Sequence, residues 1–344
     1  MHKRYFMTLC ALLSGLAAGA QDDRPDGLVM FYNVENLFDP EDDPHTQDND
    51  FTPSGKNAWT WTRLAKKRNS IAKTIIAIGE GNAPVLAGLC EVENHLVLKH
   101  LVERTPLSKI GYGIVHHDSP DPRGIDVALL YRTDRFKVLH AGFHKVTYGS
   151  GSSQTREILY AKGLYACCDT LHVLVNHWPS KLGGEKQSMP RRMAAAHRAK
   201  SIADSILQAS PAANIILMGD FNDTPESVPL AKGLQALPPH GNPSADSLYN
   251  LMLPLAERGE GSLRYRGQWE LIDQFIVSGR LLQPDATLQC LPHGVKVFKA
   301  PFLLEDDEKY LGEKPFRTYQ GPVYKGGASD HLPVVLPVQL KSRP

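Results

Sequence analysis

Side chains that can bind a metal ion or transfer a proton recur at the ends of apolar, strand-like runs in this 344-residue sequence. Six stretches show the pattern, in the order FYNVEN, GLCEVEN, LVNHWPSK, LMGDFND, LIDQF and GGASDHLPV. Their candidate residues are Asn33, Glu35, Glu91, Asn176, His177, Lys181, Asp220, Asn222, Asp273, Asp330 and His331. A strand needs only an ordinary turn residue to end, so this repeated gathering of carboxylates, amides and histidines predicts one shared site.

The residue types favour hydrolysis assisted by a hard cation. Carboxylate and amide oxygens without a Cys/His cluster suit Mg²⁺ or Mn²⁺ rather than structural zinc. Asp273 lies in an apolar run, where a carboxylate is costly to bury unless another group pairs with it. An acid that holds a histidine, a second histidine and the Asp220/Asn222 pair can move a proton and stabilise a charged oxygen. Phosphate ester hydrolysis uses these parts together with a metal.

Each stretch taken alone also has a purely structural explanation. Asn33 is typical of a turn or a cap, and Asp220 with Asn222 is typical of an Asx turn. His177 alone is typical of a hydrogen-bonded structural histidine, and Glu91 of a charged residue at a strand end. The combination favours chemistry, since independent turns would not collect the same residue types six times.

Apolar patterns predict the elements that carry these residues. We expect strands at 28–34, 84–94, 126–132, 157–167, 171–178, 214–220, 270–278 and 331–340. Helices are predicted at 61–79, stopped by Gly79, and at 187–209, beginning near Pro190. Strands outnumber helices and the two do not alternate, which favours a mixed α/β sandwich with outer helices over a doubly wound parallel sheet. The basic residues Lys66–Arg68 are expected to face solvent.

The motifs YNVENLF, GLCEVEN, NHWPSK, GDFND, ID and SDHLPV, in this order, resemble those of the endonuclease/exonuclease/phosphatase superfamily, which includes deoxyribonuclease I. The resemblance spans roughly residues 28–340. It implies a four-layered α/β/β/α sandwich of two packed mixed β-sheets with outer helices, forming a single domain over residues 21–344. It also implies a divalent-metal-dependent site at one rim of the two sheets, with Mg²⁺ or Mn²⁺ as cofactor.

The resemblance assigns a role to each matching residue. It implies metal binding by Glu91, Asn33, Glu35 and Asp330, and catalytic roles for His177, Asp220, Asn222, Asp273 and His331. Asp273 would hold His331, which explains an acid inside an apolar strand, and His177 would bind phosphate or protonate the leaving group. Whether Asp220 or His331 is the general base stays open. Asn176, Lys181 and Arg123 are the candidate substrate-binding residues, although Arg123 also fits an ordinary loop charge.

The N-terminus reads as a secretory signal. His2–Arg4 is a charged region, residues 5–16 form an apolar region, and Ala18–Ala20 has the small-x-small cleavage pattern. The apolar run is too short for a comfortable membrane span. We therefore expect residues 1–20 to be removed near Ala20 and the protein to be secreted or periplasmic. Export permits disulfides, but the spacing of Cys90, Cys167, Cys168 and Cys290 decides no pairing.

The net charge of +1 predicts no general electrostatic attraction of the protein to a polyanion or to a membrane surface. We expect an exported monomeric phosphoesterase that acts as a nuclease or phosphodiesterase on nucleic acid. The alternatives are a phospholipid or inositol-phosphate substrate for the same site, or a catalytically silent binding protein. Loops 39–57, 241–268 and 299–328 would set the substrate, and the segment 302–327 would form one wall of the site.

Overall fold

The computed structural model describes residues 25–149 and 155–341. The predicted signal peptide, residues 1–20, lies outside this range, so its cleavage stays a prediction. Within the described residues, no helix is both long enough and apolar enough to cross a membrane.

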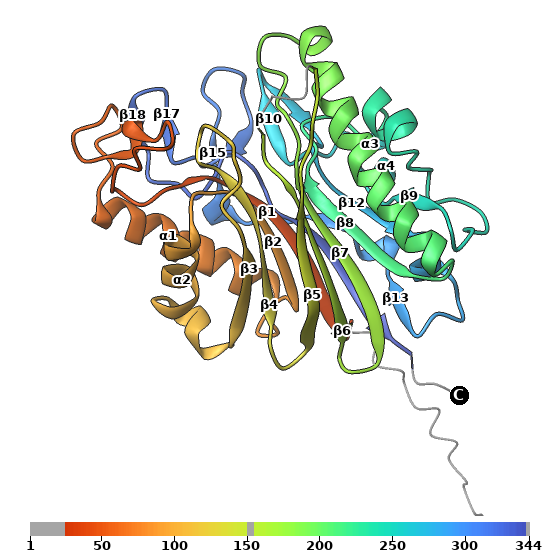
Figure 1. Cartoon of the computed structure of the whole chain (residues 1–344). Helices are drawn as coiled ribbons and strands as arrows, with labels where there is room; N and C mark the ends of the chain where they lie inside the picture. The colour runs from red at the N-terminus through yellow and green to blue at the C-terminus, as the bar shows by residue number, and fades with distance from the viewer. Residues whose placement is uncertain (1–24, 150–154, 342–344) are drawn as a thin grey trace, which may run out of the picture.

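Two large mixed sheets form the centre of the molecule (Figure 1). Sheet A has the order β13 (Leu288–Cys290), β19 (Val334–Leu340), β1 (Gly27–Leu37), β2 (Leu86–Val92), β4 (Asp126–Arg132) and β3 (Tyr112–His116), with β14 (Lys296–Val297) also paired to β19. Sheet B has the order β5 (Phe136–His144), β6 (Ile158–Tyr165), β7 (Asp169–His177), β8 (Asn214–Asp220), β12 (Asp273–Ser278) and β9 (Leu248–Asn250). Three small hairpins join β10 (Leu263–Tyr265) to β11 (Gln268–Glu270), β15 (Leu304–Asp306) to β16 (Glu313–Pro315), and β17 (Tyr319–Gln320) to β18 (Val323–Tyr324).

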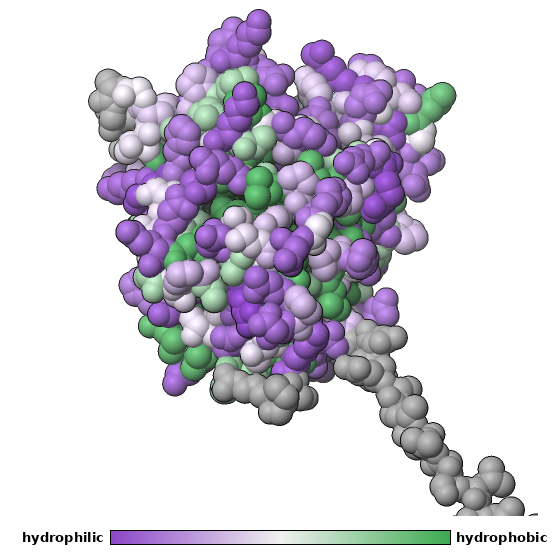
Figure 2. Space-filling model, turned by 90° about the vertical axis from the view of Figure 1, so that its right-hand side faces the viewer, coloured by the Kyte–Doolittle hydropathy of each residue, from purple (hydrophilic) through white to green (hydrophobic). Residues whose placement is uncertain are grey.

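Helices cover the outer faces of both sheets, as the predicted α/β/β/α sandwich requires. The helices α1 (Trp61–Ile78) and α2 (His95–Glu103) share an apolar cluster with sheet A. On the other side, α3 (Glu185–Ala209) packs on sheet B through small and aliphatic side chains, and the short α4 (Leu253–Glu257) lies nearby (Figure 1). The surface on this side is mainly hydrophilic with small apolar patches (Figure 2), as expected for helices that bury one face.

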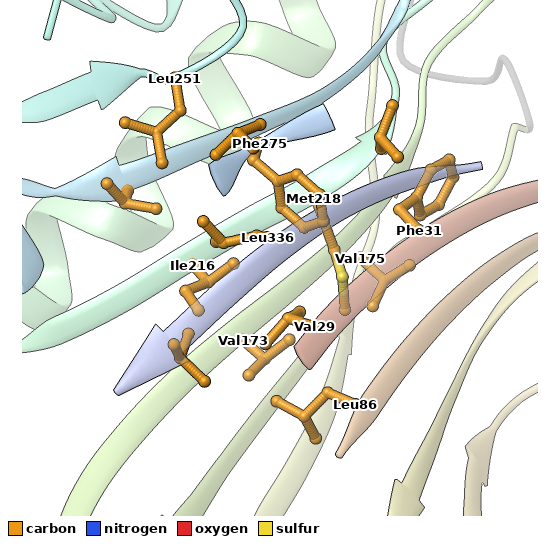
Figure 3. Packing of buried hydrophobic residues seen from close by; sticks show 14 of the residues in the cluster. Val29, Phe31, Leu86, Val173, Val175, Ile216, Met218, Leu251, Phe275 and Leu336 are labelled. Atoms are coloured by element: carbon orange, nitrogen blue, oxygen red, sulfur yellow. The ribbon is translucent and has the colours of Figure 1, made fainter. Parts of the chain in front are cut away.

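A third apolar cluster fills the space between the sheets (Figure 3). Val29 and Phe31 of β1 face Val175 and Met218 of sheet B there, and all four are fully buried. Met30, the residue between Val29 and Phe31, points the other way into the cluster under α1 and α2. Covering both faces explains why the inner strands are apolar without interruption.

Strand direction brings the polar ends to one rim. β1 and β2 are parallel in sheet A, and β7 and β8 are parallel in sheet B. β12 runs antiparallel to β8, which places Asp273 at its beginning opposite Asp220 at the end of β8. β19 runs antiparallel to β1, so the residues just before it arrive at the same end.

Several predicted boundaries differ from the observed ones. The helix α3 begins at Glu185, so Pro190 lies inside it rather than near its start. β12 and β19 begin at Asp273 and Val334, three residues later than predicted, because the preceding residues form the loops of the rim. Cys167 and Cys168 lie in the turn between β6 and β7, and all four described cysteines are free.

The expectation that Lys66–Arg68 faces solvent is wrong for Lys67, which is fully buried. Lys67 Nζ donates hydrogen bonds to Thr318 Oγ1 and, at 2.9 Å, to the carbonyl of Ala328. Burial lowers the pKa of Lys67 to about 8, although the Glu35 and Asp330 carboxylates favour its charged form. A signal existed in the sequence, since Lys67 sits on the same helical stripe as Leu64 and Ile71.

Replacing Lys67 by methionine is expected to lower the free energy of unfolding by about 3 kcal/mol, because it leaves buried acceptors and carboxylates without their cation. Urea unfolding followed by circular dichroism measures this. The adjacent, exposed Lys66 provides the matched control, and Lys66→Met should change stability by no more than about 0.5 kcal/mol. Equal stability of the two variants would show that the Lys67 contacts contribute nothing.

Candidate active site

Asp220 occupies the centre of the rim, and four other groups point at its carboxylate. Asn33 Nδ2 donates to Oδ2 at 3.0 Å, and the backbone N–H of Asn222 donates to Oδ1 at 2.8 Å. The Nε2 atoms of His177 and His331 lie 3.7 and 3.9 Å from Oδ2. Burial, with the negative charge of Asp273 nearby, raises the pKa of Asp220. The structure thus brings together residues from both sheets around one carboxylate.

Asp273 and His331 form the pair expected from the sequence. Asp273 Oδ2 lies 2.7 Å from His331 Nδ1, and Asp273 is fully buried. Burial works against a charged imidazole, but the Asp273 carboxylate outweighs it, and the pKa of His331 is raised well above its ordinary value. Ser329 Oγ accepts from the His331 backbone N–H at 3.0 Å and donates to the carbonyl of Asn33, which fixes this loop against β1.

His177 faces two carboxylates from the end of β7. Its Nε2 lies 4.0 Å from Glu91 Oε1 and 3.7 Å from Asp220 Oδ2, so Nε2 is the nitrogen turned toward the reacting space. Burial, and then the positive charges of Arg156 and Arg123, lower the pKa of His177 well below its ordinary value. The surroundings of the two site histidines therefore shift their pKa values in opposite directions.

Backbone irregularities aim the side chains at the ends of β1 and β2. Glu91 has a φ of +60°, and the register between β2 and β4 shifts at this point. Glu35 and Asn36 likewise have φ values of +48° and +57° where the pairing of β1 with β2 shifts. Positive φ is uncommon for residues other than glycine, and bulges of this kind redirect side chains next to active sites. Here they let the Asn36 N–H donate to Glu91 Oε2 at 3.0 Å.

Asn33 orients the carboxylates through its amide nitrogen. Its Oδ1 accepts from the Glu35 backbone N–H at 2.9 Å, and only an oxygen can accept there. Nδ2 therefore faces Asp220 at 3.0 Å and Glu91 at 3.4 Å. This geometry lets Asn33 orient both carboxylates, and the metal binding that the resemblance implies stays a prediction.

Glu35 is held by groups other than a metal. Its Oε1 accepts from Arg317 at 3.1 Å and its Oε2 from the Thr318 N–H at 2.7 Å, while Arg317 also donates to Asp330 at 2.9 Å. Arg317 was not among the predicted site residues, although it lies in the segment 302–327 expected to form a wall. Glu35 therefore balances the charge of Arg317, and its metal ligation stays a prediction.

The three predicted substrate-binding residues lie in different surroundings. Arg123 is exposed and donates to Asn36 Oδ1 at 3.2 Å, next to Glu91. Lys181 is partly exposed on the sheet B side, 3.4 Å from Asp223 and 4.0 Å from Glu270. Asn176 is fully buried, and its amide bonds to the carbonyls of β7 and β8 and to Trp178 Nε1. Asn176 is therefore not placed to contact a substrate, because its side chain points away from the rim.

Gly219 lets β7 and β8 approach each other directly beside the site. A Cβ atom at Gly219 would lie 2.4 Å from the carbonyl oxygen of Asn176, its partner on β7. The next pair along these strands is His177 with Asp220. The glycine of the GDFND stretch is thus required by the close approach that brings these two side chains together.

Gly219→Ala is expected to cost about 2 kcal/mol of stability and to lower kcat, since the added methyl group pushes His177 and Asp220 apart. Urea unfolding and steady-state kinetics measure the two effects. Gly142→Ala in β5 is the control, because a Cβ there would make only ordinary contacts of 3.6 and 4.0 Å. Activity and stability unchanged by Gly219→Ala would contradict the close approach.

Comparisons with known proteins agree with this architecture. The model of the endonuclease/exonuclease/phosphatase family matches residues 28–340. No curated protein matches the chain. Among solved structures, the human nocturnin catalytic domain with bound sulfate is 16% identical, with 92% of this chain and 96% of that chain covered and a TM-score of 0.56.

Two similar structures come from Bacteroides thetaiotaomicron. An endonuclease/exonuclease/phosphatase family protein is 14% identical, with 93% of this chain and 100% of that chain covered and a TM-score of 0.54. A mannosyl-6-phosphatase is 15% identical, with 90% and 98% covered and a TM-score of 0.51. Identities this low establish a common fold and leave the substrate open.

The family match defines an enzyme that hydrolyses phosphate esters with the help of a divalent metal ion. The chain belongs to the endonuclease/exonuclease/phosphatase family.

The donor set fits such a metal ion. Glu91 and Asp330 have side chains that are 15% and 25% exposed at the rim, whereas Asp220 and Asp273 are buried. Glu91 is further held in place by Asn33 and the Asn36 N–H. Oxygen donors of this kind, few in number and open on one side, suit a hard cation that keeps several waters. Glu91 and Asp330 are the partly exposed carboxylates at the rim that could hold it.

Proposed function

We propose that this protein is an exported, Mg²⁺-dependent phosphodiesterase that cleaves nucleic acid and acts as a monomer. The observation that supports this best is the convergence of Glu91, Asp220 and two histidines at the rim, flanked by a cation on each side. Arg123 stands on the sheet A side and Lys181 on the sheet B side. A phosphodiester chain presents further phosphates on both sides of the scissile one, which these cations match.

The roles of the residues follow from their positions. Bound Mg²⁺ would be held chiefly by Glu91 and would polarise the phosphoryl group. Asp220 orients the attacking water and accepts its proton, while Asn33 and the Asn222 N–H hold its carboxylate. His331, braced by Asp273, donates from Nε2 to a phosphoryl oxygen. His177, on the other side of Asp220, contacts the phosphate next to the leaving oxygen.

Because the net charge is near neutral, individual residues near the site must provide the attraction for the substrate. A protein with a net charge of +1 gains little general attraction to a polyanion. Arg123, Lys181 and the metal site therefore supply most of the binding. A non-specific nuclease with modest affinity fits this charge distribution better than a tight duplex binder.

Export is the second component of the proposal, and it rests on the N-terminal pattern alone. Expression of the full chain in a bacterial host should yield protein outside the cytoplasm whose N-terminus is Gln21. Intact protein beginning at Met1 and retained in the cytoplasm would refute export without affecting the enzymatic proposal.

A substrate panel tests the enzymatic proposal. Purified protein is incubated with plasmid DNA, RNA, bis-p-nitrophenyl phosphate, sphingomyelin, inositol phosphates and mannose 6-phosphate, each with Mg²⁺ and with a chelator. Metal-dependent cleavage of DNA or RNA at a higher kcat/KM than any other substrate is the expected result. Preference for a lipid, an inositol phosphate or a sugar phosphate would replace the nuclease proposal with that substrate class. Hydrolysis of none would favour a binding protein.

A further inference from the structure

A hollow of about 480 Å³ lies on the outer face of sheet B, beside the C-terminal half of α3. His144 from β5, Tyr160 and Lys162 from β6 and His172 from β7 line one side, and Arg198 of α3 lines the other. The volume falls in the range typical of small-molecule sites. The hollow is separate from the active site, because alternation along β7 turns His172 to the outer face and Val173 and Val175 to the inter-sheet core.

The charged groups of this hollow all carry the same sign. Lys162 and Arg198 line it, and neither forms an ion pair with any described carboxylate. No acidic residue lines the hollow, and Asp204 on the same helix is paired with Lys200 instead. Two unpaired cations that face one cavity repel each other, so an anion between them would be stabilised.

The hydrogen-bonding groups are also unbalanced. Arg198 Nη2 donates to His144 Nδ1 at 3.1 Å, which leaves the His144 proton on Nε2. Arg198 Nε is buried and has no hydrogen-bond partner. Tyr160 joins His172 through a 2.8 Å contact between its hydroxyl and Nδ1. Arg198, which lines the cavity, therefore has a donor left without an acceptor.

Apolar side chains complete the lining. Ile202, Ile206 and Ala209 lie along the same side of α3 and line the hollow beyond Arg198. An inorganic ion would leave this surface uncovered, whereas the body of an organic molecule would cover it. Cationic side chains line one part of the hollow and aliphatic side chains line another, which matches a ligand with an anionic group and an apolar body.

We propose that this hollow is a binding site for a small organic phosphate, whose phosphate group is held by Lys162 and Arg198 and whose body packs on Ile202 and Ile206. A guanidinium and an ammonium on opposite walls suit a tetrahedral dianion. The site is distinct from the hydrolytic rim and does not depend on the proposed substrate.

The histidines of the hollow provide a direct readout. Burial, and then the positive charges of Arg198 and His140, lower the pKa of His144, and burial with Lys162 lowers the pKa of His172 to about 4. Tyr160, which contacts both rings, stays uncharged because burial raises its pKa. A bound dianion would reverse the field at both rings, so their pKa values should rise on binding.

The experiment follows histidine ring signals by NMR in the whole protein with a chelator present, which prevents turnover. Sulfate and phenyl phosphate are the two probes, since sulfate stays fully ionised and phenyl phosphate adds an apolar ring. We expect saturable shifts of the His144 and His172 signals, with phenyl phosphate binding at least ~5-fold more tightly than sulfate. The pKa of both histidines should rise in the complex.

Two variants make the result decisive. Lys162→Gln with Arg198→Gln should weaken binding at this site at least ~10-fold and leave Mg²⁺-dependent hydrolysis within about two-fold of the wild type. Ser205→Asp places a carboxylate in the hollow and should abolish binding without removing a cation. Unchanged His144 and His172 signals, shifts confined to His177 and His331, or equal binding by the wild type and both variants would overturn the proposal.

Discussion

Asp220→Asn and His331→Ala are each expected to lower kcat at least ~100-fold, the contribution typical of a general acid–base group. Asp220 is the carboxylate on which Asn33, His177 and His331 converge, and asparagine retains its shape while removing the charge. Because the two residues act on the same phosphoryl group, the double variant should lose less than the product of the single losses. Steady-state hydrolysis of bis-p-nitrophenyl phosphate measures all three.

Glu226→Gln is the matched control for these variants. Glu226 is exposed and lies six residues after Asp220, so its loss should change kcat by less than about two-fold. Near- and far-ultraviolet circular dichroism shows that each variant is folded. Hydrolysis that continues at the wild-type rate in the double variant would place the reaction elsewhere in the molecule.

Glu91→Gln is expected to remove the stabilisation that Mg²⁺ gives to the protein, together with most of the activity. A ligand that binds only the folded state at about 100 times its Kd adds about 2.7 kcal/mol of stability. The rise in melting temperature on adding Mg²⁺ to wild-type protein should therefore be absent, or reduced several-fold, in the variant. Calorimetry with and without the metal measures this independently of catalysis.

Asp330→Asn provides the comparison within the same site. Asp330 also faces Arg317, which neutralises part of its charge, so its loss should reduce the metal effect less than the loss of Glu91. An equal Mg²⁺-induced shift in wild type and Glu91→Gln would show that Glu91 does not hold the metal.

The mixed sandwich and the need for a partner at Asp273 were predictable because both follow from burial, whereas the layer order and His331 as that partner were implied by the family resemblance. Apolar strands without alternation imply two covered faces, and a carboxylate within one of them implies a partner. The same logic applied to the helical stripe of α1 would have found Lys67, whose position between Leu64 and Ile71 predicts burial.

The bulges at Glu35 and Glu91 were not predictable. Their positive φ values depend on where the chain leaves the sheet, and glutamate has no particular preference for that conformation. The hydrogen-bond partner of Glu35 was not predictable for a different reason. Arg317 lies 282 residues away in the sequence, in a long segment whose lack of regular periodicity predicts no contact. Asn176 was misplaced because one residue along a strand decides which face a side chain occupies.

The two sheets each supply part of the rim: Glu91 and Asn33 come from one, while His177, Asp220 and Asp273 come from the other. The contact of Phe31 and Val29 with Met218 and Val175 helps to fix the relative position of the sheets, together with the Asn33–Asp220 and His331–Asp273 hydrogen bonds at the rim. A small shift of one sheet over the other would separate Glu91 and Asn33 from His177, Asp220 and Asp273 while leaving every strand intact. Turnover therefore measures the alignment of the two sheets more sensitively than any spectroscopic signal of secondary structure.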